Sequence, residues 1–115
     1  MTEQQIQKAV FQHFAQRSAP GVVAWHTPNG GFRRKAEAAI MKGLGVLPGL
    51  PDVIAVKGGK LFALELKKPG GRLTRAQERM LIDLRAAGAM AMHAHGLDQA
   101  LGQLERWGLL LGKVT

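Results

Sequence analysis

The chain has 115 residues, enough for one hydrophobic core and too few for two, so we expect a single domain over residues 1–115. Hydrophobic residues make up 46% of the sequence and charged residues 21%, a balance that argues against disorder. Sixteen Lys and Arg against eight Asp and Glu give a formal net charge of +8, which favours nucleic acid as a partner but says nothing about catalysis.

Cysteine is absent, which excludes disulfides, thiolate zinc sites and cysteine nucleophiles. No apolar run reaches the roughly 20 residues that a membrane span requires, and the first residues are not those of a signal peptide. We therefore expect a cytoplasmic protein, in a bacterium or a phage-infected host cell, with no membrane partner.

The first half of the sequence predicts a helix, a short strand and a long connection. Thr2 begins a plausible capping box, and apolar residues then recur at helical spacing up to about residue 17. Residues 22–26 are apolar and partly β-branched, which suits a strand. Residues 27–50 are loop-like at both ends, with one or two helical turns expected over residues 35–42. A connection of this length is more often functional than decorative.

The second half predicts a hairpin, a helix, a strand and a last helix. Residues 52–67 form two strands around a glycine pair at 58–59, which supplies the positive φ angles of a tight turn. A helix over 74–88, a strand over 89–95 and a helix over 97–107 follow. The order of elements predicts an α/β fold with a mixed four-stranded sheet flanked by helices.

The hairpin turn determines which residues of the two strands face each other. With the glycine pair in the turn, Asp52 lies opposite Glu65, and their side chains are about 5 Å apart on one face. Lys67 points to the same face. Two opposed acids destabilise a sheet unless they are neutralised, and a divalent cation such as Mg²⁺ or Mn²⁺ does this directly. Alternatively, Glu65 and Lys67 are a solvated pair on an edge strand.

These residues resemble the signature of a known enzyme superfamily. Pro51-Asp52 followed by Glu65-Leu66-Lys67 matches the PD-(D/E)XK nucleases. The finer context resembles the virus-type replication-repair nuclease (VRR-NUC) group within that superfamily. That finer likeness lies in residues 45–52, 62–67 and 71–77.

The resemblance implies a restriction-endonuclease-like αβββαβ core, divalent-metal cleavage of phosphodiesters, and branched or structured DNA as the substrate. Small free-standing members of the group resemble homodimeric Holliday-junction resolvases, and the two-fold symmetry of a dimer would place two sites on two strands. We therefore expect a junction-resolving homodimer. A flap or nicking endonuclease of the same superfamily and a non-catalytic basic DNA-binding module are the alternatives.

The expected roles combine the hairpin geometry with the resemblance. Asp52 and Glu65 are expected to bind Mg²⁺ or Mn²⁺, with the backbone carbonyl of Leu66 as a third ligand. Lys67 is expected to orient the attacking water or stabilise developing charge. Related nucleases often supply another carboxylate from the first helix, so Glu3 is a candidate outer ligand. An acidic residue that interacts with the helix dipole is the equal alternative for Glu3.

Gln77 has two explanations. It matches the glutamine that follows the Glu-x-Lys strand in this group, where it would touch the metal-bound water or the phosphate. It also lies three residues after Thr74, so a capping box would be a sufficient structural reason for it.

Two basic clusters are expected to contact flanking DNA phosphates. They are Arg33, Arg34 and Lys35 in the long connection, and Lys68, Arg72 and Arg75 after the second strand of the hairpin.

Histidines and tryptophans receive mostly structural interpretations. His93 and His95 alternate on a strand, but nothing near them in the sequence completes a metal-ligand set, so we interpret them as ordinary strand residues. His26 lies closer to the expected cleft and stays open. Trp25 and Trp107 are interpreted as core or dimer-interface aromatics.

Overall fold

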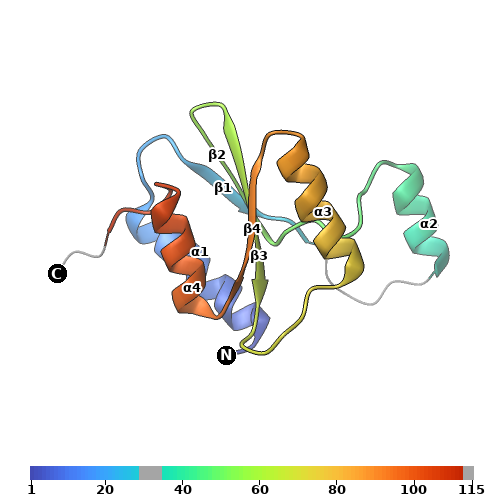
Figure 1. The fold of residues 1–115 in the computed structure, drawn as a ribbon, viewed down its shortest axis with the longest axis horizontal. Helices are drawn as coiled ribbons and strands as arrows, with labels where there is room; N and C mark the ends of the chain where they lie inside the picture. The colour runs from blue at the N-terminus through green and yellow to red at the C-terminus, as the bar shows by residue number, and fades with distance from the viewer. Residues whose placement is uncertain (29–34, 113–115) are drawn as a thin grey trace.

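The computed structural model describes residues 1–28 and 35–112 of the chain. The elements in chain order are α1 (Glu3–Arg17), β1 (Val23–His26), α2 (Lys35–Gly43), β2 (Val53–Lys57), β3 (Lys60–Lys67), α3 (Arg75–Ala86), β4 (Met90–His95) and α4 (Leu97–Arg106), as Figure 1 shows. This order is the one predicted from the sequence. The bounds differ from the predicted ones by at most two residues.

The strands form one mixed sheet in the order β1-β2-β3-β4. Strand β2 pairs antiparallel with both β1 and β3, whereas β4 pairs with β3 in parallel, as the crossover through α3 requires. Helices α1 and α4 lie on one side of the sheet and α3 lies on the other (Figure 1). The expected α/β fold with a mixed four-stranded sheet flanked by helices is confirmed.

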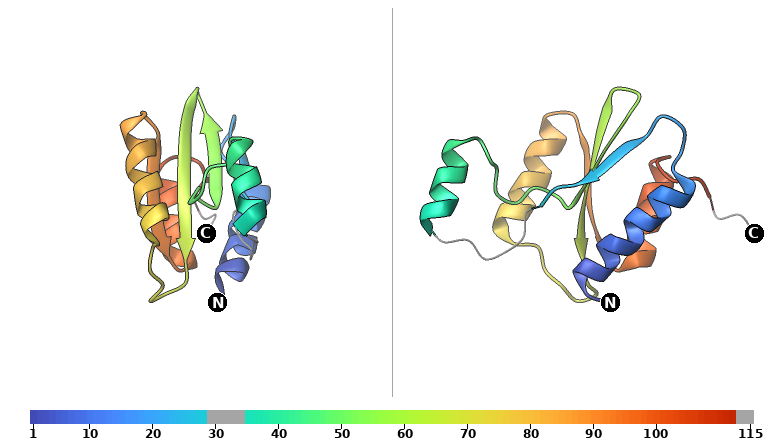
Figure 2. Two further views of the ribbon diagram at one scale, coloured as in Figure 1. Left: turned by 90° about the vertical axis from the view of Figure 1, so that its right-hand side faces the viewer. Right: turned by 180° about the vertical axis from the view of Figure 1, so that it is seen from behind.

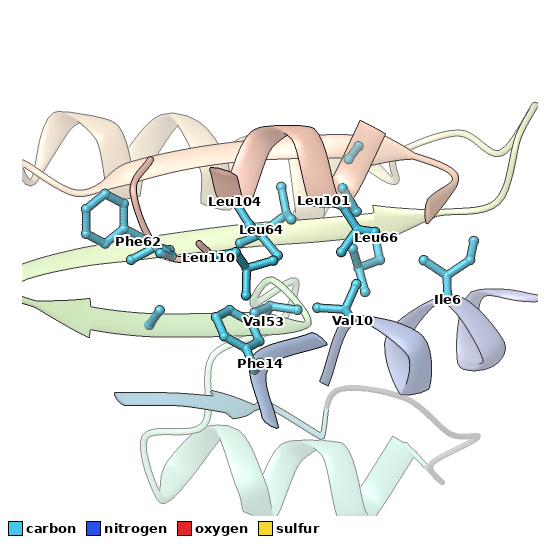
Figure 3. Close-up of a cluster of buried hydrophobic side chains, with 14 residues drawn as sticks. Ile6, Val10, Phe14, Val53, Phe62, Leu64, Leu66, Leu101, Leu104 and Leu110 are labelled. Carbon is cyan, nitrogen blue, oxygen red and sulfur yellow. The ribbon is translucent and has the colours of Figure 1, made fainter. Parts of the chain in front are cut away.

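The main hydrophobic core lies between the sheet and helices α1 and α4 (Figure 3). The side chains labelled there are Ile6, Val10, Phe14, Val53, Phe62, Leu64, Leu66, Leu101, Leu104 and Leu110, and Leu109 belongs to the same core. A smaller cluster on the opposite face holds α3, where Leu81 packs against Ile54, Ala63 and Ala91. Successive residues of a strand point to opposite faces, so the sheet is anchored on both sides.

Helices α1 and α3 begin with the capping boxes that the sequence predicted. The Thr2 hydroxyl accepts a hydrogen bond from the backbone N–H of Gln5, whose side-chain oxygen accepts one from the backbone N–H of Thr2. Thr74 and Gln77 repeat the same exchange at the start of α3. Each box satisfies N–H groups that have no partner within the helix, and it fixes where the helix starts.

The tight turn of the β2–β3 hairpin lies where the sequence predicted it. Gly58 and Gly59 have φ angles of 58° and 76°, and Lys57 pairs with Lys60 across the turn. The same register pairs Val53 with Leu64 at the far end of the hairpin. The residues just beyond that pair therefore point to the α3 face of the sheet.

Helix α2 lies apart from the sheet, beyond α3, in Figure 1 and in the right-hand view of Figure 2. None of its side chains is buried. The chain returns from α2 to the sheet through Gly49, whose φ of +76° and close approach to the backbone of Ala76 leave no room for a side chain. We call residues 35–50 the α2 arm.

The tryptophans differ in their surroundings. Trp107 packs beside the core, with its ring centroid 5.5 Å from that of Phe62. Trp25 is 44% exposed, so it is not a core residue of the single chain. Within the described ranges, no helix is both long and apolar enough to cross a lipid bilayer.

Candidate active site

The hairpin brings Asp52 and Glu65 together at the end of the sheet away from the turn. Asp52 directly precedes β2, and its Oδ2 atom accepts a hydrogen bond of 2.9 Å from the backbone N–H of Leu66. Glu65 lies on β3 with only 3% of its surface exposed. Each carboxyl group alters the pKa of the other. The predicted opposition of the two acids is thus present in the fold.

Both acids are held in a state that disfavours negative charge. Burial, followed by the neighbouring charge of Asp52, raises the pKa of Glu65 from 4.5 to about 8. Burial also raises the pKa of Asp52, although the N–H of Leu66 opposes this by stabilising the carboxylate. Two buried acids that cannot both ionise easily hold a proton between them near neutral pH. A cation in the proton's place would relieve the same repulsion.

Lys67 lies on the same face as Glu65, two residues along β3, and is only 7% exposed. Its positive charge lowers the pKa of Glu65 and so opposes the effects of burial and of Asp52. A lysine is rarely buried without a reason of this kind. The position suits a group that acts on a negatively charged substrate bound at the acids.

Gln77 reaches the site from the first turn of α3, where it completes the predicted capping box and also contacts Glu65. Its Nε2 donates a hydrogen bond of 2.8 Å to Oε1 of Glu65, while its Oε1 accepts one of 2.9 Å from the backbone N–H of Thr74. One amide therefore completes the helix cap and orients the Glu65 carboxyl.

The other oxygen of Glu65 is available to a ligand. With both carboxyl groups charged, its buried Oε2 atom has no hydrogen-bond partner within the described residues. An unsatisfied buried oxygen is costly, which makes it suited to coordinate a cation. Across residues 1–28 and 35–112, no three His, Cys, Asp or Glu side chains form a group that could hold a metal ion. A bound ion would therefore take side-chain oxygens from Asp52 and Glu65 and its other ligands from backbone or water.

Glu3 lies near this pair without joining it. Its charge raises the pKa of both Asp52 and Glu65, and its Oε2 atom accepts a long hydrogen bond of 3.5 Å from the backbone N–H of Lys68. This geometry is compatible with an outer role beside a bound ion. The carboxylate comes from the first turn of α1, so both interpretations of Glu3 from the sequence keep a structural basis.

His26 contacts the opposite side of Asp52. Its Nδ1 atom lies 2.8 Å from the carbonyl oxygen of Asp52, and its charge lowers the pKa of the Asp52 carboxyl. The sequence left the role of this histidine open, because the contact depends on the pairing of β1 with β2. That register matches His26 with Val53, directly after Asp52.

The predicted basic residues are only partly brought together. Lys68, Arg72 and Arg75 are exposed and lie between the end of β3 and the start of α3, at the same end of the sheet as the acids. Lys35 is exposed at the start of α2. Arg33 and Arg34 lie outside the described residues.

Strand β4 adds two side chains that the sequence could not place. His93 pairs with Glu65 and His95 pairs with Lys67, so the histidines share the face of the acids. Their rings pack edge to face at 5.3 Å. The sequence could not predict this placement, because β3 and β4 are joined by a helical crossover and no local turn determines the register of such a parallel pair.

The fold and the site together define a class of protein. An acid at the start of one strand and a Glu-x-Lys triplet on the next, on a mixed sheet with a preceding helix, form the arrangement of the PD-(D/E)XK nucleases.

Comparisons with known proteins place the chain within that class. Residues 1–98 match the model of the VRR-NUC domain, and the chain therefore belongs to the VRR-NUC family of nuclease domains. A solved structure described as a VRR_NUC domain protein has 26% sequence identity and a TM-score of 0.77, covering 93% of this chain and 88% of its own.

A more distant likeness concerns the fold alone. Hjc of Archaeoglobus fulgidus, a Holliday junction resolvase, has 18% identity and a TM-score of 0.51 over 81% of this chain and 67% of its own. No curated protein matches the sequence.

Proposed function

We propose that the protein is a Mg²⁺- or Mn²⁺-dependent endonuclease that hydrolyses DNA phosphodiester bonds, and that it resolves Holliday junctions as a homodimer. The observation that carries the proposal is the unpartnered Oε2 atom of Glu65, buried beside a second acid whose pKa is also raised. A cation binds such a pair by replacing the shared proton.

The side chains would divide the chemistry as follows. Asp52 and Glu65 would hold the ion, with the Leu66 carbonyl as a third ligand and Glu3 as an outer one. When bound, the ion polarises the scissile phosphate and makes a water molecule easier to deprotonate. Lys67 stabilises the charge that develops on the phosphate oxygens and orients the attacking water.

Gln77 acts on this site through Glu65. By donating to Oε1 it would keep Oε2 directed to the ion, and the second N–H of the same amide would be the donor to the water or the phosphate. Metal ligands are commonly oriented by such outer hydrogen bonds. Hydrolysis then adds one water across the phosphorus–oxygen bond and leaves one strand end with the phosphate.

Charge and family support the choice of substrate. The net charge of +8 attracts DNA, and the exposed Lys68, Arg72 and Arg75 lie where a strand entering the site would pass. A two-fold dimer would present two such sites to the paired strands of a four-way junction. The junction-resolving activity of the distantly similar archaeal protein agrees with this choice.

Cleavage of fluorescent four-way junctions, flaps and splayed duplexes tests the proposal. We expect the junction to be cut in Mg²⁺ or Mn²⁺ and to stay intact in EDTA. Lys67→Ala should lower the rate by at least about 100-fold, in line with the loss of a group that stabilises the transition state. Lys60→Ala, at the exposed start of the same strand, is the matched control and should cut normally.

Three outcomes would contradict parts of the proposal. A protein that shifts the junction in a gel but never nicks it is a DNA-binding module, whose acid pair serves only the fold. Preferential cutting of flaps would show that the protein is a flap endonuclease with the same metal-dependent chemistry, and would contradict the choice of Holliday junctions as the substrate. Full activity in Lys67→Ala would reject the site.

A further inference from the structure

On the face of the sheet that α3 covers, β3 and β4 change from apolar to polar residues at the same paired positions. Ala63 and Ala91 form the last apolar row, buried beneath Leu81 of α3. The next row pairs Glu65 with His93. Helix α3 thus covers the sheet up to the acids, and β4 extends the polar surface beyond them.

His93 is placed as the third member of a line across the sheet. Asp52 precedes β2, Glu65 lies on β3 and His93 lies on β4, and neighbouring strands are about 4.8 Å apart. His93 therefore lies one strand spacing from Glu65, on the side away from Asp52. A strand of DNA whose phosphate is bound at the acid pair would pass close to it.

The His93 ring is available and held in place. It is half-buried, and within the described residues its ring nitrogens have no hydrogen-bond partner. The ring of His95 packs edge to face against it at 5.3 Å. The Nδ1 atom of the His95 ring lies in turn 3.5 Å from the carbonyl oxygen of Lys68. An oriented and unpartnered N–H donor is what a phosphate oxygen accepts from.

We propose that His93 is a substrate-binding residue that donates a hydrogen bond to the DNA phosphate next to the scissile one. The inference rests on the proposed nuclease function, and it adds a substrate contact on β4 to the residues of β2 and β3. We do not infer a transition-metal site here, since no three potential ligands of the described chain form a group around the histidines.

Substitution of His93, with Met92 as the matched control, tests the inference. Met92 lies on the same strand, points to the opposite face and is 37% exposed. For His93→Ala we expect a KM for junction DNA, and a Kd measured with Ca²⁺ in place of Mg²⁺, that rise about tenfold, the effect of one hydrogen bond to a charged group. The kcat should stay within about twofold, and Met92→Ala should match the wild type.

Replacing single phosphates by uncharged methylphosphonates tests which phosphate His93 contacts. Methylphosphonate substitution at successive positions beside the cut should raise the wild-type KM at one position and leave the KM of His93→Ala unchanged there. A residue that served only the fold would give additive effects instead. His93→Gln, which keeps an N–H donor, should recover part of the affinity, and thermal melting of each variant shows whether it is folded.

The outcomes separate this inference from the proposed function. Wild-type protein that neither binds nor cuts the junction would overturn both. Wild-type cleavage with an unchanged KM in His93→Ala, or strictly additive effects of the variant and the methylphosphonate, would overturn the role of His93 alone.

Discussion

At the scale of single residues, Glu65 shows a conflict between stability and chemistry. The folded protein buries its carboxyl group next to the charge of Asp52, so the charged form is disfavoured. A metal ligand must nevertheless be charged. The free energy of unfolding of the metal-free protein should therefore depend on pH, and bound metal should remove part of that dependence.

The sign follows from the raised pKa of Glu65. In the unfolded chain the carboxyl loses its proton near pH 4.5, and in the folded protein near pH 8. Between these values the folded state binds more protons, so stability falls as pH rises through this window. Glu65→Gln removes the titrating group, and in EDTA it should melt higher than the wild type at pH 8, with a smaller difference at pH 5.

Thermal melts of both proteins from pH 5 to pH 9 measure this effect. The Gln variant should cleave no DNA, and addition of Mn²⁺ should raise the melting temperature of the wild type only. A variant that melts below the wild type at pH 8 would show that the negative charge of Glu65 stabilises the fold.

At the scale of elements, the α2 arm is tied to the active site at one tight contact. A Cβ atom on Gly49 would lie 2.6 Å from the carbonyl oxygen of Ala76, in the first turn of α3. The next residue, Gln77, orients Glu65. The start of α3 can therefore hold its position only if position 49 has no side chain.

Gly49→Ala should disturb both stability and catalysis. The clash with Ala76 and the strained φ of +76° should cost about 2 kcal/mol or more of unfolding free energy, and the displaced Gln77 should lower kcat. Gly45→Ala is the control, because its φ of +92° imposes similar strain while nothing lies within 4 Å of the added Cβ. Urea unfolding and single-turnover cleavage measure the two effects; equal losses in both variants would rule out the clash.

The sequence predicts the parts of this arrangement that are local. The glycine pair at 58–59 determines the register of its own hairpin, and that register alone opposes Asp52 and Glu65. The capping boxes and apolar periodicity likewise determine the helices. The pairing of β3 with β4 and the approach of Gly49 to Ala76 join distant segments, so no local pattern could reveal His93 beside Glu65 or explain that glycine.

At the scale of the whole molecule, the α2 arm exposes four large apolar side chains. Ile40, Leu44, Val46 and Leu47 are 65%, 79%, 48% and 52% exposed. A nine-residue helix without buried side chains gains little stability by itself. The proposed homodimer would give this surface a partner, because a second copy of the chain can cover it reciprocally about a two-fold axis.

Leu44→Asp tests this location of the dimer interface. A charge placed in a buried apolar contact should shift the sedimentation mass at micromolar concentration from two chains to one. Ile82→Asp, at an apolar residue of α3 that is 53% exposed, should leave two chains associated. A sedimentation mass of one chain for the unmodified protein would contradict the proposed homodimer. If both variants have the mass of two chains, the interface does not lie on the α2 arm.

The first turn of α3 also limits which residues can replace Gln77. Position 77 must accept a hydrogen bond from the helix cap and donate one to an acid with the same short group. Glutamate could accept but not donate, and it would add a further negative charge; asparagine is one methylene shorter, and lysine can only donate. The Gln77 amide thus both caps α3 and orients Glu65. A substitution that keeps the cap, such as glutamate, therefore loses the hydrogen bond to Glu65.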